Sequence, residues 1–265
     1  MLDQAIDPLK RPREGDWVVP WGVTDPAECY WYHAFDLPGI GDIPGGWDLR
    51  GTIDAYLGGA SLEGLTFIDL GTASGFVSFA AERRGARVIS YDIGDPRKEL
   101  QPNLLPRPRD DGRRDELLDE AERNVEQMKR SYWLAHRLLG SEAKAYYGDL
   151  YRLSELLYPV DVVHVGQILV HLRDPLGALT EAGRLARKRL VIVEGSMSTE
   201  EPLAGLLARA QGPERSWWHF SIGFYRRFLE VLGFEIEDVE IERHLCPARD
   251  DSLELKTITA VRVEG

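Results

Sequence analysis

The chain has 265 residues, of which 43% are hydrophobic and 29% are charged, a composition typical of a globular protein with a core. Its 44 acidic and 32 basic side chains leave a formal charge of −12, which argues against broad binding to a nucleic-acid backbone. Two cysteines exclude a disulfide framework, and neither a long apolar run nor a signal-peptide pattern is present, so we expect a cytoplasmic protein.

The beginning of the chain is unusually aromatic. Four of the seven tryptophans and six prolines fall within the first 47 residues. Prolines at this density interrupt regular helices and strands. We therefore predict that residues 1–60 form an aromatic arm that lies over a pocket of the following unit, residues 61–265. The tryptophans of this arm are Trp17, Trp21, Trp31 and Trp47.

After the arm, strand and helix patterns alternate. In chain order we predict a helix at 49–57, a strand at 65–70, a helix at 74–84, a strand at 87–91, a proline-rich loop at 94–112, a helix at 113–139, a strand at 143–147, a helix at 150–157, a strand at 160–165, a helix at 175–186, a strand at 189–194, a helix at 221–232 and strands at 234–241 and 255–263. This order predicts a Rossmann-like α/β fold with a seven-stranded, mostly parallel sheet and an antiparallel last strand.

The strongest local pattern is DLGTASG at residues 69–75, where a strand runs into a glycine turn that opens a helix. The spacing of Gly71 and Gly75 differs from GxGxxG, which disfavours the pyrophosphate of a dinucleotide. Asp69 ends the strand, where it could accept a hydrogen bond from a ligand's ammonium group. Asp92 ends the next strand, and a carboxylate there can bind both hydroxyls of a ribose.

Three motifs together resemble those of class I S-adenosylmethionine-dependent methyltransferases: DLGTASG, then YD at Tyr91 and Asp92, then GDL from Gly148. The resemblance spans residues 65–263 and implies S-adenosylmethionine as the cofactor. It implies that the glycine turn binds the methionine part, Asp92 the ribose and Asp149 the adenine amino group. The cofactor-binding residues expected on this basis are Asp69, Gly71, Thr72, Ala73, Gly75, Phe76, Asp92, Ile93, Gly148, Asp149, Leu150, Gly166 and Gln167.

Two further segments, GQILVHLRDP from Gly166 and GGWDLR from Gly45, resemble a methyltransferase branch related to the tRNA wobble-uridine carboxymethyltransferases. In that branch the arm helps to cover the cofactor, which implies Trp47 and Arg50 as additional cofactor contacts. Val170 stands where the tRNA enzymes carry a tyrosine. Together with the acidic charge, this departure disfavours carboxymethyl transfer to tRNA.

Methyl transfer from a sulfonium is an in-line displacement that depends chiefly on positioning and on exclusion of water. His171 and His33 are the candidate catalytic residues, with a purely structural histidine as the alternative for each. Aromatic side chains beside His33 and His219 either hold a planar acceptor or attach the arm to the sheet. These candidate substrate contacts are Trp31, Tyr32, Trp217, Trp218 and His219. We place His164 in the core and His136 and His244 at the surface.

We therefore expect a methyltransferase that acts on an oxygen or nitrogen of a small aromatic or polar metabolite. Modification of a tRNA nucleoside and catalytically silent cofactor binding are the alternatives. No set of His, Cys, Asp or Glu residues has metal-ligand spacing, so no catalytic metal is expected. The expected partner is a small-molecule acceptor, with a homodimer left open.

Overall fold

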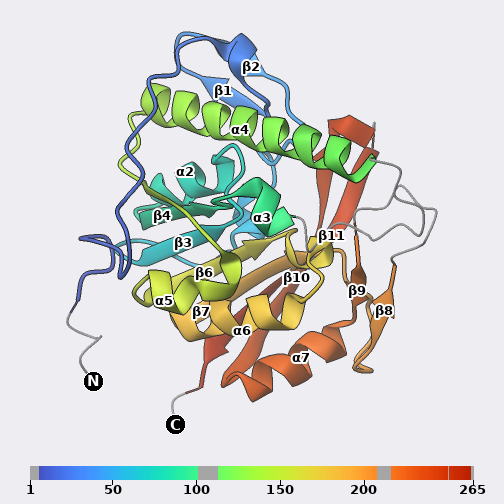
Figure 1. Ribbon diagram of the computed structural model, residues 1–265. Helices are drawn as coiled ribbons and strands as arrows, with labels where there is room; N and C mark the ends of the chain where they lie inside the picture. Colours follow the sequence, from blue (N-terminus) through green and yellow to red (C-terminus); the bar gives the residue numbers. More distant parts are fainter. Residues whose placement is uncertain (1–5, 101–112, 208–215, 250, 264–265) are drawn as a thin grey trace.

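A computed structural model describes residues 6–100, 113–207, 216–249 and 251–263 (Figure 1). A seven-stranded sheet lies at its centre, with the strands in the order β10-β11-β7-β6-β3-β4-β5. These strands are β3 (Thr66–Leu70), β4 (Arg87–Asp92), β5 (Lys144–Tyr147), β6 (Val160–Gly166), β7 (Ala186–Glu194), β10 (Phe234–Cys246) and β11 (Asp251–Arg262).

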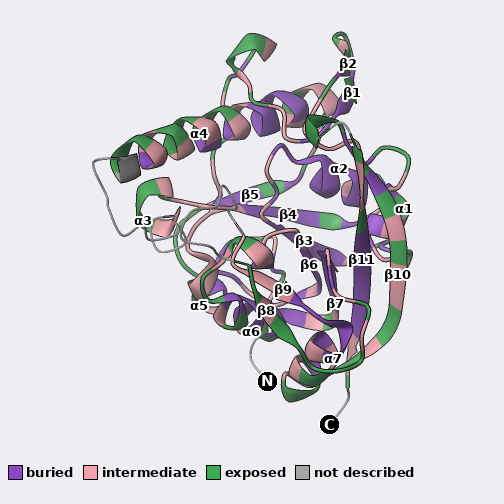
Figure 2. Ribbon diagram, turned by 90° about the vertical axis from the view of Figure 1, so that its right-hand side faces the viewer, coloured by how far each residue is buried: buried purple, intermediate pink, exposed green. Residues whose placement is uncertain are grey.

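The sheet is parallel except for its last strand. β3 pairs in parallel with β4 and β6, whereas β11 runs antiparallel to both β7 and β10. The predicted α/β fold is therefore confirmed. β11 lies one position inside the sheet and is largely buried, while β10 forms the exposed edge (Figure 2). The strand order reverses between β3 and β6, and ligands of such sheets bind beside the carboxyl ends of the strands at that point.

Helices cover both faces of the sheet, as Figure 1 shows. Because successive side chains of a strand point to opposite faces, Phe67 of β3 packs in one core and Ile68 in the other. The first core contains residues of α1 (Ile53–Tyr56), α2 (Phe76–Glu82) and α4 (Arg113–Leu139). The second contains residues of α5 (Leu153–Leu156), α6 (Pro175–Leu185) and α7 (Ile222–Val231).

The segment predicted as a proline-rich loop begins with a short helix, α3 (Pro96–Leu100). The Lys98 N–H donates to Asp95 Oδ1 at 3.2 Å, and the Asp95 N–H donates to Glu99 Oε1 at 2.9 Å. Pro96 is thus the first helical residue, a position where proline favours a helix instead of breaking it. The remainder of the predicted loop, 101–112, lies outside the described residues.

The arm crosses the edge of the sheet at β5 before it reaches the cavity described below. The Val18 N–H donates to the Ala145 carbonyl at 2.9 Å. Trp17 packs edge-on against Tyr146, with ring centroids 6.2 Å apart, and Trp21 contacts Tyr147 in the same way. These two tryptophans therefore cover the β5 edge, whose backbone groups lack a neighbouring strand on that side.

The rest of the arm contains regular structure that the prolines did not predict. β1 (Phe35–Leu37) and β2 (Gly41–Ile43) form an antiparallel hairpin above α4 (Figure 1). A second hairpin, β8 (Ala204–Leu206) with β9 (Trp218–Phe220), lies near the other end of the molecule. Among the described residues, no helix has both the length and the apolar character needed to cross a membrane.

Candidate functional site

Four strands end side by side at one edge of the sheet, and each ends in residues that the sequence analysis singled out. The Gly148 N–H donates to the Asp92 carbonyl at 3.0 Å, which joins the turn after β5 to the end of β4. Parallel strands make this convergence possible, since all their carboxyl ends lie at the same edge. The edge carries residues 71–75 after β3, Asp92 and Ile93 at β4, Gly148 to Leu150 after β5, and Gly166 and Gln167 at β6.

The turn after β3 has a backbone conformation that ordinary residues avoid. Gly71 has φ 76°, and a Cβ atom there would lie 2.6 Å from Ile168 Cγ2. Gly75 has φ 89°, and a Cβ atom there would lie 2.5 Å from the ring of Phe79. Ala73 also has a positive φ, 51°, which is uncommon for a residue with a side chain. Both glycines are therefore required by the local geometry.

The N–H groups of this turn are bonded within the protein. Those of Gly71 and Thr72 both donate to the Tyr91 carbonyl, at 2.9 and 3.0 Å. That of Ala73 donates to Asp92 Oδ2 at 2.8 Å. N–H groups engaged in this way are not aimed at a phosphate, which agrees with the missing dinucleotide pattern.

Asp92 is fixed at the end of β4. Its Oδ1 accepts the Ile93 N–H at 2.7 Å, while its Oδ2 accepts the Ala73 N–H. Burial raises the pKa of Asp92, and these two hydrogen bonds together with the charge of Lys129 oppose the rise. The carboxylate keeps further lone pairs with which it can accept hydrogen bonds from a pair of ligand hydroxyls.

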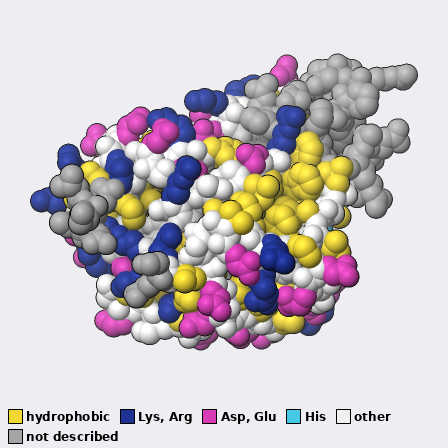
Figure 3. All heavy atoms as spheres, turned by 90° about the horizontal axis from the view of Figure 1, so that it is seen from below, with side chains coloured by type: hydrophobic (Ala, Val, Ile, Leu, Met, Phe, Trp, Pro, Cys, Tyr) yellow, Lys and Arg dark blue, Asp and Glu magenta, His cyan; other side chains and the backbone are white. Residues whose placement is uncertain are grey.

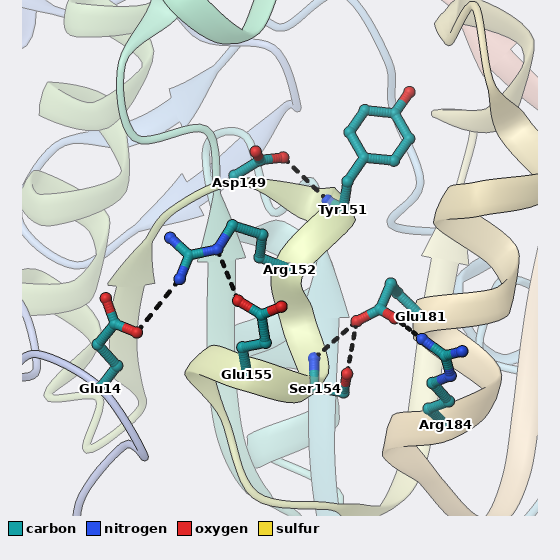
Figure 4. Close-up of polar contacts among 8 residues, drawn as sticks. All are labelled: Glu14, Asp149, Tyr151, Arg152, Ser154, Glu155, Glu181 and Arg184. Atoms are coloured by element: carbon teal, nitrogen blue, oxygen red, sulfur yellow. Dashed lines mark hydrogen bonds and ion pairs between the residues drawn. The ribbon is translucent and has the colours of Figure 1, made fainter.

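The turn after β5 is held by several polar contacts (Figure 4). Asp149 Oδ1 accepts the Tyr151 N–H at 2.9 Å and so caps a 3-10 helix, η4 (Leu150–Arg152). Arg152 bonds to Glu155 and to Glu14 of the arm, at 2.8 and 3.3 Å. Oδ1 of Asp149 therefore maintains the turn, so a ligand would hydrogen-bond mainly to the other carboxylate oxygen, Oδ2.

A cavity opens where β3 and β6 end, between the sheet edge and the arm. The arm contributes Tyr32, His33, Trp47, Leu49 and Tyr56, and the sheet side contributes Asp69, Gly71, Thr72, Val77, His164, Gly166 and Gln167. The structure thus brings predicted cofactor and arm residues together around one space. Of the four arm tryptophans, Trp47 is the one that lines it.

Other predicted site residues lie elsewhere. Arg50 is paired with Asp48 and Asp42, at 2.6 and 2.5 Å, and does not line the cavity. Trp31 packs against Phe35 with ring centroids 5.5 Å apart, and Phe76 packs against the same ring. The arm residues Trp31 and Arg50 therefore support the local structure of the arm.

The second aromatic cluster flanks the segment after β6. The Trp217 N–H donates to the Val170 carbonyl at 2.7 Å, and Trp218 Nε1 donates to the Arg173 carbonyl at 3.3 Å. His219 lies in β9, and His171 is exposed at the end of a 3-10 helix, η5 (Leu169–His171). None of these four residues lines the cavity, although Trp217 and Trp218 bond to the segment that follows Gln167.

His33 is buried and bonded to the glycine turn. Ser74 Oγ accepts the His33 backbone N–H at 3.0 Å and lies 3.1 Å from His33 Nδ1. Because the Ser74 hydroxyl is completely buried, its hydrogen needs an acceptor, and the lone pair of Nδ1 provides one. Burial lowers the pKa of His33 to about 4. A neutral ring that accepts at Nδ1 carries its hydrogen on Nε2, so His33 is arranged as a hydrogen-bond donor.

Sequence reasoning missed two buried residues near the cavity. Glu194 ends β7, is 1% exposed, and accepts hydrogen bonds from Gln167 Nε2 and the Leu169 N–H, at 2.9 and 3.0 Å. Burial raises its pKa to about 8. His244, expected at the surface, is completely buried because its ring, near the C-terminal end of β10, packs against Thr52 and Tyr56. An acidic residue that ends an apolar strand was the available signal for Glu194.

His164 is in the core, as expected, but it also lines the cavity. Its Nδ1 lies 3.2 Å from Asp69 Oδ1, and its Nε2 lies 3.1 Å from the Tyr56 carbonyl. Within the described residues, no group of three His, Cys, Asp or Glu side chains is placed to hold a metal ion.

Comparisons with known proteins identify the fold. No protein-family model and no curated protein sequence matches the chain. Magnesium protoporphyrin IX methyltransferase from Synechocystis PCC 6803, with SAM bound, is similar over 81% of this chain and 77% of that chain, with a TM-score of 0.50 and 16% identity. Its complex with SAH gives the same TM-score and identity over 81% of each chain.

A protein of Bacillus halodurans assigned as a methyltransferase is similar over 81% of this chain and 100% of that chain, with a TM-score of 0.50 and 11% identity. The chain has the Rossmann-like fold of these methyltransferases. At such low identity the likeness establishes the fold alone, so activity has to be argued from the site.

Proposed function

We propose that this protein is an S-adenosylmethionine-dependent methyltransferase that acts on an oxygen or nitrogen of a small metabolite. The observation that carries the proposal is the arrangement at the sheet edge. A glycine turn whose N–H groups are bonded internally lies beside Asp92, and the capped turn at Asp149 follows. This order along β3, β4 and β5 suits a ligand with an amino-acid end, a ribose and an adenine.

The residues present fit this cofactor. Gly71 lines the cavity, and it has to be glycine because Ile168 already fills the position that a Cβ atom would take. Asp92 would bind the ribose hydroxyls, Gly148 to Leu150 would flank the adenine, and the cavity at Asp69 would hold the methionine part. S-adenosylmethionine supplies a methyl group activated by its sulfonium.

The protein's own contribution is binding, orientation and exclusion of water. Tyr32 and Trp47 line the cavity from the arm, opposite the glycine turn. Their aromatic surfaces would exclude water and position a planar acceptor. His33 would donate a hydrogen bond from Nε2. His171 stays a candidate base, since its exposed position at the end of η5 allows an acceptor to reach it.

A small acceptor is favoured over tRNA by charge. The chain carries a net charge of −12, and on the face seen in Figure 3 basic side chains are interspersed with acidic ones. Binding to a nucleic-acid backbone draws most of its affinity from a basic stripe. Formation of a homodimer stays a prediction.

Calorimetry with S-adenosylmethionine and S-adenosylhomocysteine tests the proposal. We expect both to bind, and Asp92→Asn to weaken binding about tenfold or more, because it removes the charge that strengthens hydrogen bonds to the ribose. Asp36→Asn, at an exposed position of β1, is the matched control and should bind like the wild type. A wild-type protein that binds neither compound would contradict the proposal.

A second measurement separates the alternatives. Tight tRNA binding with a steep dependence on salt would replace the small acceptor with a nucleic acid. Binding of S-adenosylmethionine without turnover on either tRNA or a panel of small acceptors would point to a catalytically silent protein.

A further inference from the structure

Gln167, the residue that follows β6, has a strained backbone. Its φ is 55°, in the region that favours glycine, although it carries a long side chain. Its N–H donates to the Val193 carbonyl at 2.9 Å, and the residue lines the cavity. Strain of this kind persists where surrounding contacts enforce it, and it is concentrated at functional sites.

Glu194 fixes the orientation of the Gln167 side chain. Gln167 Nε2 lies 2.9 Å from Glu194 Oε2 and 3.4 Å from the Val193 carbonyl. Both of these neighbours are hydrogen-bond acceptors when Glu194 is ionised. The amide nitrogen, which has two hydrogens to donate, therefore has to face them, and the opposite orientation would place three acceptors together.

In this orientation the carbonyl oxygen Oε1 is the polar atom of the Gln167 side chain that does not face Glu194. Among the described residues, no group donates a hydrogen bond to it, and Gln167 is only half-buried. Because the residue lines the cavity, a bound molecule would meet an oriented hydrogen-bond acceptor at this point.

We propose that, with Glu194 ionised, Gln167 determines acceptor specificity by requiring an N–H or O–H on the group to be methylated, and that Glu194 is a positioning residue that orients the Gln167 amide. This inference rests on the proposed function, because it places the methyl acceptor in the cavity. It narrows the substrate class to molecules whose reacting nitrogen or oxygen still carries a hydrogen. Nucleophiles without one, such as tertiary amines and ring nitrogens that carry only a lone pair, would be disfavoured.

The test has to be made at a pH at which Glu194 is ionised, so the groups that face Glu194 are considered first. Lys256 lies opposite it in the register of β7 and β11 and donates to the Ser196 carbonyl at 2.7 Å. Glu194 also interacts electrostatically with the hydroxyls of Tyr32, Tyr56 and Tyr225. Since burial raises the pKa of Glu194 to about 8, the carboxylate form is secured by working at about pH 9.

Sinefungin provides a probe that needs no knowledge of the natural acceptor. It resembles S-adenosylhomocysteine but has an amino-bearing carbon in place of the sulfur, so its N–H groups lie where the transferable methyl group of S-adenosylmethionine would be. Calorimetry at about pH 9 gives the ratio of the two affinities. An acceptor atom beside that position, as we infer for Gln167 Oε1, favours sinefungin.

Glu194→Gln should reverse the orientation of the Gln167 amide, while the side chain at position 194 keeps its shape. Its new NH2 group would donate to Gln167 Oε1, which turns the Gln167 NH2 group toward the cavity. We expect the preference for sinefungin over S-adenosylhomocysteine to fall about threefold to tenfold, the value of one net hydrogen bond. Gln167→Gly suits the positive φ and removes the amide, so it should lower the preference similarly while folding normally.

Glu237→Gln, the same change at an exposed position of β10, is the matched control and should keep the wild-type ratio. An unchanged ratio in both Glu194→Gln and Gln167→Gly would overturn the inference while leaving the proposed function intact. Failure of the wild type to bind either compound would instead overturn the proposed function.

Discussion

His164 and Asp69 form a buried pair in which Nδ1 lies 3.2 Å from Oδ1. The other ring nitrogen of His164 lies 3.1 Å from the Tyr56 carbonyl, which can only accept a hydrogen bond. Nε2 can therefore donate a hydrogen to that carbonyl, while Nδ1 faces the carboxyl group of Asp69. Asp69 Oδ2 accepts the Ser78 hydroxyl at 2.9 Å, so both oxygens of the carboxyl group have partners within the protein.

The pair predicts a large loss of stability when one member is removed. His164→Ala should lower the free energy of unfolding by roughly 3 kcal/mol, because Asp69, which is 3% exposed, would lose its histidine partner and keep only the hydroxyl of Ser78 among its side-chain contacts in the described residues. Urea unfolding of His164→Ala, Asp69→Asn and the double variant measures this coupling. We expect the double variant to lose less than the sum of the two single losses.

His136→Ala is the control, since the half-buried ring of His136 bonds to the Ala143 carbonyl, a neutral acceptor, and not to a buried carboxyl group. It should cost less than His164→Ala. Losses from His164→Ala and Asp69→Asn that add within about 0.5 kcal/mol would show that the two residues do not form a coupled pair.

The contact between His33 and Ser74 predicts a neutral imidazole of one defined tautomer. Since burial lowers the pKa of His33 to about 4, its ring signals should not shift as the pH changes between about 6 and 8. Isotope-edited NMR should show the hydrogen on Nε2. Ser74→Ala removes the donor to Nδ1 and should lead to a mixture of tautomers. A His33 ring that titrates in this interval, or that carries its hydrogen on Nδ1, would contradict the donor role.

The sequence predicted the sheet and the residues at its carboxyl edge because those features are local. Apolar runs at β3 and β6 are short and end in glycine or in polar residues, and the turn at Gly71 follows directly from its strand. Residues that share an edge come together automatically in a parallel sheet. For the same reason, Asp92 and Gly166 could be assigned to the site before any contact was known.

The partners of those residues were not predictable, because they depend on how distant segments cross. Glu194 acquires its contacts only when the segment from Gln167 to Leu169 passes over the end of β7. Trp17 and Trp21 are tryptophans of the same arm as Trp47. They nevertheless cover the β5 edge, since the arm reaches the cavity only later in its course. Composition shows that an aromatic arm is present but not which of its rings face a ligand.

The buried carboxyl of Glu194 predicts a stability that falls as the pH rises. Its pKa is raised by burial from 4.5 to about 8, so between these values the folded protein binds one more proton than the unfolded chain. This contribution to stability is complete below about pH 4.5 and is lost as the pH rises through 8. Its size is on the order of 5 kcal/mol.

Glu194→Gln stays neutral at every pH and removes this dependence. We expect the free energy of unfolding of Glu194→Gln, relative to the wild type, to increase steadily as the pH is raised from about 5 to about 9 in urea titrations. Glu237→Gln removes the same charge from an exposed site and should follow the wild-type curve. Parallel curves for Glu194→Gln and the wild type would mean that Glu194 is already ionised at neutral pH. In that case the Gln167 amide would be held in one orientation across the whole range, and the preference for sinefungin would not depend on pH.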